Sequence, residues 1–316
     1  MWLKTDQSFV ADKFKESVMK KMICLMIVVC LTSSVWAATW DGGGAGDQWN
    51  TPENWAGDGV PGTSSTVDLA GGTFTVKLNS AQTIKGLEMQ DAIATAADNV
   101  ALDIGTGGAL TVGAVAQAWG NGNGSSTINM TGNGSFTMGH AVQMAKHGGD
   151  FYLNMSDNAV FNMTNAAEKV RVGTGLYTTA ADFALYGSAY ARLYLDDNAS
   201  MTVGKLLIGN DNAYGDGKVT VAGNSTLQIT GTPVWSLYVG GAGGTGQLDI
   251  TGDGSLIMKG LITDVTSFGN VTANGGIDTF AYSYDDVTEL TTITAIPEPI
   301  TIALLGFGGL FLRRRK

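Results

Sequence analysis

Apolar and polar residues alternate with a period of two through the middle of the chain, and the alternation recurs in similar copies. Six fourteen-residue segments align without a gap, and each holds one apolar pair followed eight residues later by a second pair. The first pairs are Leu102/Ile104, Ile128/Met130, Leu153/Met155, Leu193/Leu195, Val219/Val221 and Leu248/Ile250; the second pairs are Leu110/Val112, Phe136/Met138, Phe161/Met163, Met201/Val203, Leu227/Ile229 and Leu256/Met258. Alternation of this kind is typical of a strand with one buried face, so each segment predicts two short strands.

A third apolar pair follows the first two in most copies, again with one residue between its members. These pairs are Val142/Met144, Val170/Val172, Leu206/Ile208 and Leu237/Val239. The copies begin 26, 25, 40, 26 and 29 residues apart, so three strands and three turns fit most intervals. Like residues at like offsets predict an all-β parallel β-solenoid of about seven to eight coils, in which equivalent positions stack. A β-sandwich is the competing fold, but it would not require the repeated offsets.

A turn separates the first two strands of each copy. One turn position holds Gly107, Asn133, Asn158, Asn198, Asn224 and Asp253, and the next holds Gly108, Gly134, Ala159, Ala199, Ser225 and Gly254. Asn, Asp and Gly tolerate a positive φ, so the first position is predicted to be left-handed. The second position is predicted to accept only small side chains. We interpret both positions as structural, and the asparagines as no catalytic set.

Glycine and tryptophan are frequent in residues 38–66, directly before the repeats of residues 67–290. Trp40, Trp49 and Trp55 lie in this segment, which we expect to form an N-terminal cap. Exposed aromatic rings can stack on sugars, so these side chains are candidates for glycan contact. The alternative, which we favour, is that they cover the open end of the solenoid, whose strand edges need protection. Residues 278–284 and 288–295 are expected to close the other end.

The 40-residue interval leaves an insertion near residues 174–190. Insertions in solenoids map to loops on one face, and that face often binds a partner. Tyr177, Tyr186 and Tyr190, together with Phe183, are therefore further candidates for glycan contact. An irregular corner in which these rings pack on one another is an equally good interpretation.

Residues 1–37 are typical of a secretory signal peptide with a helical apolar segment. Two lysines precede an apolar run, residues 22–31, and small residues precede a cleavage site after Ala37. The best-formed signal begins at Met19, which is an alternative start of the protein. Both cysteines of the chain lie in this leader. The mature protein is therefore expected to have no disulfide, no thiolate nucleophile and no Cys-ligated zinc.

The C-terminus combines a Pro-Glu-Pro triplet, residues 297–299, with an apolar run, residues 300–312, and four final cations. Each proline restricts the preceding residue to extended backbone, a form suited to a protease-like cleft. Thirteen apolar residues make about 20 Å of helix, which is short for the roughly 30 Å hydrocarbon core. The run is thus predicted to be a short transmembrane helix that anchors the protein only temporarily. The final cations follow the positive-inside rule, so the bulk of the protein is expected on the far side of the membrane.

This arrangement resembles the PEP-CTERM sorting signal of bacterial surface proteins, here over residues 291–316. The resemblance implies processing by an exosortase-type transpeptidase, transient residence in the inner membrane, and delivery to the cell surface or extracellular matrix. It also implies an exopolysaccharide or biofilm setting, with extracellular polysaccharide as a partner besides the processing enzyme and signal peptidase. The Trp-rich opening before the repeats resembles that of autotransporter-like β-helical proteins. The implied sorting residues are Pro297, Glu298, Pro299, Arg313, Arg314 and Arg315.

The mature region is strongly acidic, because residues 38–299 hold nine Lys/Arg against 25 Asp/Glu, a net charge of −16. Such a surface disfavours nucleic acid and anionic membranes as partners, and it is compatible with neutral glycans or cations. Weak calcium binding is conceivable at residues 196–198 or 210–217. Neither segment has EF-hand spacing, so we predict no dedicated metal site and no cofactor.

Candidate catalytic residues are few. His140, His147 and Asp150 lie close in sequence, but such turn clusters are usually solvated. The chain has no Gly-x-Ser-x-Gly nucleophile elbow, and only Arg171 and Arg192 supply guanidinium groups in the repeats. We therefore expect an exported structural or adhesive protein that is not an enzyme. A polysaccharide-active lyase or hydrolase on a β-helix is the alternative.

Overall fold

The structure, a computed structural model, describes residues 37–89, 99–113, 117–119, 124–145, 148–175, 189–209, 215–232, 236–241 and 243–296. The chain from Ala37 onward forms one unit. The expected signal helix and the expected C-terminal transmembrane helix lie outside the described residues. Within the ranges given above, no helix is both long enough and apolar enough to cross a membrane.

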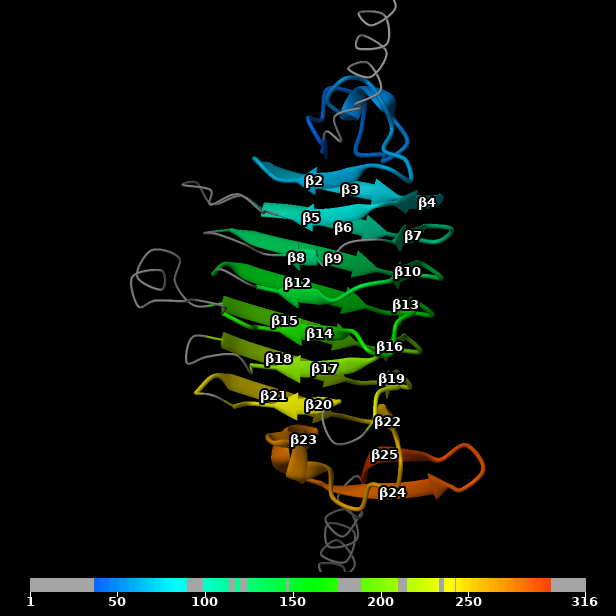
Figure 1. Cartoon of the computed structure of the whole chain (residues 1–316), viewed down its shortest axis with the longest axis vertical. Helices are drawn as coiled ribbons and strands as arrows, with labels where there is room; N and C mark the ends of the chain where they lie inside the picture. Colours follow the sequence, from blue (N-terminus) through cyan, green and yellow to red (C-terminus); the bar gives the residue numbers. More distant parts are fainter. Residues whose placement is uncertain are drawn as a thin grey trace, which may run out of the picture. The chain divides into compact units, whose positions relative to one another are not determined.

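Three sheets run through the repeats, and each coil contributes one strand to each sheet (Figure 1). Sheet 1 contains β3 (Thr73–Leu78), β6 (Asn99–Ile104), β9 (Ser125–Met130), β12 (Asp150–Met155), β15 (Ala189–Leu195), β18 (Gly215–Val221), β21 (Thr245–Ile250) and β23 (Val271–Ala273). Sheet 2 contains β4 (Ala81–Ile84), β7 (Ala109–Val112), β10 (Ser135–Met138), β13 (Val160–Met163), β16 (Ser200–Val203), β19 (Thr226–Ile229), β22 (Ser255–Lys259), β25 (Leu290–Ile296) and β24 (Thr279–Asp285). Sheet 3 contains β1 (Ala38–Thr39), β2 (Thr66–Leu69), β5 (Gly86–Met89), β8 (Gln117–Trp119), β11 (Val142–Met144), β14 (Lys169–Val172), β17 (Lys205–Ile208) and β20 (Leu237–Val239). Short 3-10 helices are η1 (Pro52–Asn54), η3 (Val265–Phe268) and η4 (Asn274–Gly276).

The strand register confirms the gap-free alignment of the copies. Successive partners along sheet 1 are Leu102, Ile128, Leu153, Leu193, Val219 and Leu248, all in parallel pairing. The 40-residue interval leaves this ladder unbroken, because β12 pairs directly with β15 across it. The fold is therefore a parallel β-solenoid of about seven coils, as the repeat predicts, and a β-sandwich is excluded.

The apolar pairs form one continuous core. All members of the three sets of pairs are buried, with exposed fractions no higher than 3%. Phe136 and Phe161 lie at the same position of successive coils, with ring centroids 5.5 Å apart. Complete burial of such a side chain contributes about 1.5–3 kcal/mol, so this ladder stabilises the stacking of coil on coil along the whole repeat.

The left-handed residue of the first turn lies one position earlier than predicted in most copies. Gly107 has the predicted positive φ, but the other positive φ values are at Gly132, Asp157, Asp197, Gly223 and Gly252. In the other five copies both central residues of the turn are Gly, Asn or Asp, which all tolerate positive φ, so residue type alone could not show which of the two is left-handed. Only the first copy has a β-branched residue, Thr106, at the earlier position, and there the left-handed conformation moves to the following glycine.

Polar side chains of the first turn connect successive coils. The Asp157 Oδ2 accepts a hydrogen bond from the Gly132 N–H at 2.8 Å, and the Asp197 Oδ2 accepts one from the Asp157 N–H at 3.3 Å. Between the first and second copies, the Gly107 N–H donates to the Asn133 Oδ1 at 2.9 Å. These bonds satisfy turn amides, which agrees with a structural role for the Asn and Asp residues.

The small residue that follows in each turn is confirmed as a packing requirement. Ala159 is fully buried, and a Cβ added at Gly134 would collide with the carbonyl oxygen of Ile104. A second left-handed column, which the sequence analysis did not identify, follows the third strands at Ala145, Gly173, Gly209 and Gly240. There a Cβ added at Gly209 would collide with the backbone of Thr245 in the next coil. At Gly209 glycine is needed because the two backbones approach closely.

The N-terminal cap covers the first strand of every sheet. Strand β1 pairs with β2, and the Trp49 N–H donates to the Lys77 carbonyl of β3 at 2.9 Å. The Asn50 side chain bonds Ser80 and Gln82 at the start of sheet 2. Trp49 and Trp55 pack edge to face with centroids 4.8 Å apart. The cap thus pairs with the edge strands of sheets 1 and 3 through backbone hydrogen bonds and contacts the start of sheet 2 through side chains.

The other end of the solenoid is closed by an antiparallel hairpin. Strand β25 pairs antiparallel with β22, and β24 pairs antiparallel with β25. The chain between β22 and β24, which includes η3 and β23, pairs with β21 of sheet 1 and with β20 of sheet 3. Figure 1 shows this hairpin beyond the last coil, at the opposite end of the stack from the Trp-rich cap.

Candidate functional site: a tyrosine–arginine cluster

The outer face of sheet 1 changes character at β12 and β15. In a strand, residues between the buried positions point outward, and most outward residues of sheet 1 are Thr, Ser, Asn, Asp or Lys. Among the described strands of this sheet, tyrosines occupy outward positions only at Tyr152, Tyr190 and Tyr194. All three lie on two neighbouring strands, β12 and β15, which pair in parallel. Aromatic side chains are therefore concentrated at one place on this face.

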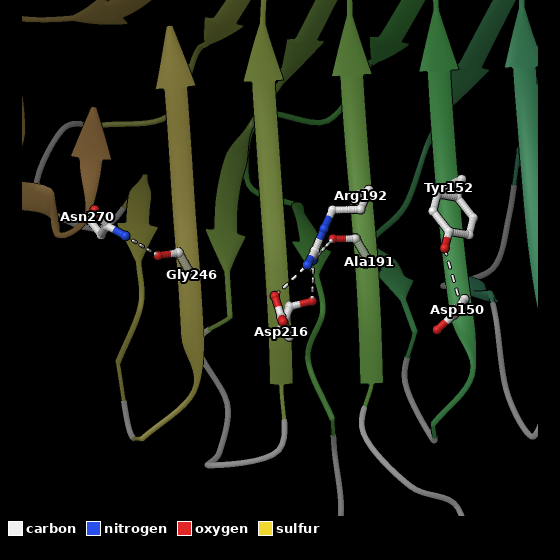
Figure 2. A network of polar contacts seen from close by, with 7 residues as sticks. All are labelled: Asp150, Tyr152, Ala191, Arg192, Asp216, Gly246 and Asn270. Carbon is white, nitrogen blue, oxygen red and sulfur yellow. Dashed lines mark hydrogen bonds and ion pairs between the residues drawn. The ribbon is translucent and has the colours of Figure 1, made fainter. Parts of the chain in front are cut away.

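The strand register brings polar and charged residues beside these rings. Tyr190 pairs with Asp150 on β12 and with Asp216 on β18, and Arg192 pairs with Tyr152 and Lys218 on the same two strands. Neighbouring strands are about 4.8 Å apart, so side chains at paired positions touch. Figure 2 shows Arg192 extended toward Asp216, and Tyr152 beside Asp150. We call Asp150, Tyr152, Tyr190, Arg192 and Asp216 the tyrosine–arginine cluster.

Arg192 is fixed by several contacts. Its Nη1 donates to the Asp216 Oδ1 at 2.9 Å, the Asp216 carbonyl at 3.3 Å and the Ala191 carbonyl at 3.0 Å. Its Cζ lies 3.3 Å from the centroid of the Tyr190 ring, in a cation–π contact. Within the described residues its hydrogen bonds all come from Nη1, which leaves the Nε and Nη2 donors for a ligand.

Tyr152 presents a second ring next to Tyr190. The two centroids are 6.1 Å apart and the rings are tilted by 57°. The Tyr152 Oη donates to the Asp150 Oδ2 at 3.4 Å. Burial raises the pKa of the Tyr152 phenol, and the negative charge of Asp150 raises this pKa further. Tyr152 therefore stays protonated at neutral pH and keeps its hydroxyl as a donor.

Tyr194 extends the aromatic surface along β15. Its Oη donates to the Asp196 Oδ2 at 3.3 Å, and burial, followed by the charge of Asp196, raises the pKa of this phenol. The Asp196 Oδ1 accepts from the Asp197 N–H at 2.8 Å. The Asp196 carboxylate, in one of the two segments considered for weak calcium binding, therefore makes hydrogen bonds within its own turn and strand. In the described part of the chain, no three His, Cys, Asp or Glu side chains come together as a metal-binding group.

The structure separates the residues that sequence analysis grouped as candidates. Of the three insertion tyrosines, Tyr190 lies in the cluster, and Tyr177 and Tyr186 lie outside the described residues. His147 also lies outside them, while the His140 Nδ1 is 3.7 Å from the Glu168 Oε1. Asp150 instead contacts Tyr152 in sheet 1.

The three cap tryptophans are core residues. Trp40, Trp49 and Trp55 have exposed fractions of 6%, 1% and 0%. A sugar stacks on an exposed ring face, and these rings have none, so their placement supports the end-covering interpretation over glycan contact. Tyr152, Arg192 and Asp216 were not among the site residues predicted from the sequence. The repeat alignment could have predicted part of this cluster, because it places Tyr152 and Arg192 at equivalent positions of adjacent strands.

Stacked coils around a single apolar core define the class of the protein as a parallel β-solenoid. The C-terminus gives the more specific assignment, since residues 295–316 match the PEP-CTERM protein-sorting motif. The chain is therefore an exported protein that is sorted by an exosortase-type enzyme and held at the membrane during sorting. No curated protein and no solved structure shows significant similarity to the chain. The likeness to autotransporter-like proteins rests on the Trp-rich opening and the β-helical repeat.

Proposed function

We propose that this exported β-solenoid is a structural or adhesive protein of the cell surface or extracellular matrix and that it is not an enzyme. The observation that carries the proposal is the outer face of sheet 2, where outward positions repeat small hydroxyl and amide residues. One such column contains Thr83, Thr111, Thr137, Asn162, Thr202 and Gln228. A face of this kind suits lateral contact with hydrated polymers and offers no group for acid–base chemistry.

The tyrosine–arginine cluster does not favour the enzymatic alternative. A glycosidase acid is a carboxyl group in an apolar pocket, where its pKa rises. Asp216 is instead paired with Arg192, and Asp150 accepts a hydrogen bond from Tyr152. Both carboxylates lie on an outward sheet face beside polar residues. The cluster therefore resembles a recognition surface more than a catalytic pair.

The test combines location with turnover. The native host should be fractionated and the protein located by antibody, and the purified protein should be incubated with neutral and anionic polysaccharides while reducing and unsaturated ends are measured. We expect the protein in the surface or matrix fraction, with no release of ends. Release that disappears in the double variant Asp150→Asn, Asp216→Asn would establish the enzyme instead. Retention of the protein in the cytoplasm would contradict the proposal as well.

A further inference from the structure

We propose that the tyrosine–arginine cluster is a binding site for an extended neutral glycan that lies across β12, β15 and β18. This inference rests on the proposed surface function and names its ligand and its site. The aromatic rings, the guanidinium and the carboxylates all lie on one face of three adjacent strands. Sheet 1 continues on either side of these three strands with β9 and β21, so a long chain that crosses the cluster meets further strands of the same face.

The mixture of groups matches the chemistry of a sugar. A pyranose has an apolar face of C–H bonds, which packs on an aromatic ring, and a rim of hydroxyls that both donate and accept hydrogen bonds. Tyr152 supplies the ring, and the Arg192 Nε and Nη2 supply donors. The carboxylates of Asp150 and Asp216 supply acceptors.

The arrangement is also preorganised. Arg192 is held from one side by the ring of Tyr190 and from another by Asp216, so it loses little rotamer freedom when a ligand binds. The rings themselves stand on paired strands of the solenoid and not on a loop. A binding group that is already fixed costs less entropy on association, which allows a small patch to bind usefully.

Charge selects a neutral ligand over an anionic one. The positive charge of Arg192 is compensated by Asp216 at 2.9 Å, and Asp150 lies opposite Tyr190 on the other side. The mature region has a net charge of −16 between residues 38 and 299, so a polyanion meets long-range repulsion before it reaches the cluster. Binding by stacking and neutral hydrogen bonds is expected to persist at high salt, because salt screens mainly exposed charges.

The test uses the folded unit, residues 37–296, whose core lies entirely between Trp40 and Ala295. The protein should be applied to an array of neutral and anionic oligosaccharides at 0.1 and about 1 M salt, concentrations at which the screening length falls from about 10 to about 3 Å. Variants are Tyr152→Ala, Tyr152→Phe and Arg192→Ala. The matched control is Tyr238→Ala, an exposed tyrosine on β20 of sheet 3. Circular dichroism and the unfolding midpoint establish that each variant is folded.

We expect neutral glycans to bind at both salt concentrations. The Tyr152→Ala variant should bind about tenfold more weakly, while Tyr152→Phe and Tyr238→Ala should stay within about threefold of the wild type. Absence of any neutral ligand, equal binding by folded Tyr152→Ala, or binding of anionic glycans alone would overturn the inference. Those results would leave the proposed surface function intact if the protein still fractionates with the surface and releases no ends.

Discussion

Single residues in this solenoid are constrained mainly by backbone conformation at the turns. Asp157 has φ of 57° and also accepts a hydrogen bond from Gly132 of the preceding coil, whereas its neighbour Asn158 is exposed and has a negative φ. The two residues are chemically similar, and the sequence column places the asparagine at the left-handed position. In the structure that position belongs to the aspartate. Substitutions at Asp157 and at Asn158 therefore test which of the two residues is the left-handed one.

The change Asp157→Val should lower the free energy of unfolding by about 1–2 kcal/mol, because a β-branched side chain resists positive φ and cannot accept the Gly132 hydrogen bond. The change Asp157→Asn should cost much less, since asparagine tolerates this conformation and keeps an acceptor. The change Asn158→Val should cost only a few tenths of a kcal/mol, as for an ordinary surface site of about ±0.5 kcal/mol. Urea unfolding measures all three. A larger loss at position 158 than at 157 would show that the assignment is wrong.

Two glycines allow the free-energy cost of a left-handed backbone to be measured separately from the cost of a steric collision with a neighbouring coil. Both Gly209 and Gly252 have positive φ, at 58° and 59°, but only at Gly209 would a Cβ collide with the next coil. Gly252→Ala should therefore cost about 1 kcal/mol, the penalty for an L-residue in this region. Gly209→Ala should cost about 3 kcal/mol or more, because the backbone of two coils must move apart. Equal losses in thermal unfolding would contradict this account of the second left-handed column.

At the scale of elements, strands within the coils are protected by neighbours on both sides, but the closing hairpin depends on its own turn. Strand β24 has β25 on one side only in the described sheet. Its turn is held by Asp285, whose Oδ1 accepts from the Val287 N–H at 2.9 Å and whose Oδ2 accepts from the Thr288 Oγ1 at 2.9 Å. A single carboxylate thus supports the element that closes sheet 2.

Acid should loosen this hairpin before it loosens the coils. The Val287 and Thr288 hydrogen bonds lower the pKa of the Asp285 carboxyl below its ordinary value of 3.8. A lowered pKa means that the folded state binds fewer protons than the unfolded state. The stabilisation of the hairpin by the Asp285 carboxylate is therefore complete above the unfolded-state pKa of 3.8, and it is lost as pH falls through the lower folded-state pKa. Hydrogen exchange of β24 and β25 amides should rise there relative to β15. Asp285→Asn should remove this pH dependence, and an unchanged pH profile in that variant would contradict the role of the carboxylate.

At the scale of the whole molecule, the last strand of the folded unit and the sorting motif overlap in sequence. The matched motif begins at residue 295, and Ala295 and Ile296 are the last residues of β25, paired with Phe280 and Thr279. Ala295 is also 7% exposed and belongs to the core. A processing enzyme that acted within β25 would have to break this pairing, so removal of the signal should leave the strand in the mature protein.

Intact mass of the protein isolated from the native cell surface tests the processing. The mass should lack residues 300–316 and should include Ile296, because β25 completes the hairpin and is part of the folded unit. Retention of the basic tail on the mature protein would contradict exosortase sorting. A shorter chain that ends before Ala295 would contradict the protection of β25 by the fold.

Much of the architecture was predictable from the sequence, because its signals are local and repeated. Alternation with a period of two identifies strands, and constant offsets between copies identify the register, as Leu153 and Leu193 show across the 40-residue interval. The small turn residues followed from the same alignment. The choice between two adjacent turn residues did not, because both types tolerate positive φ.

The sequence by itself thus determined four properties of the protein. The periodic pattern predicts the β-solenoid and its register, the composition gives the acidic character, and a contiguous motif gives the sorting signal. Only the tertiary structure decided that the cap tryptophans are buried and that Tyr152, Arg192 and Asp216 form one cluster. The physical reason is that burial and cross-strand contact depend on what lies beside a residue in space. For Arg192 the repeat alignment gives the paired residues Tyr152 and Lys218, but its hydrogen-bond partner is Asp216, which pairs with Tyr190, and only the side-chain conformation decides that contact.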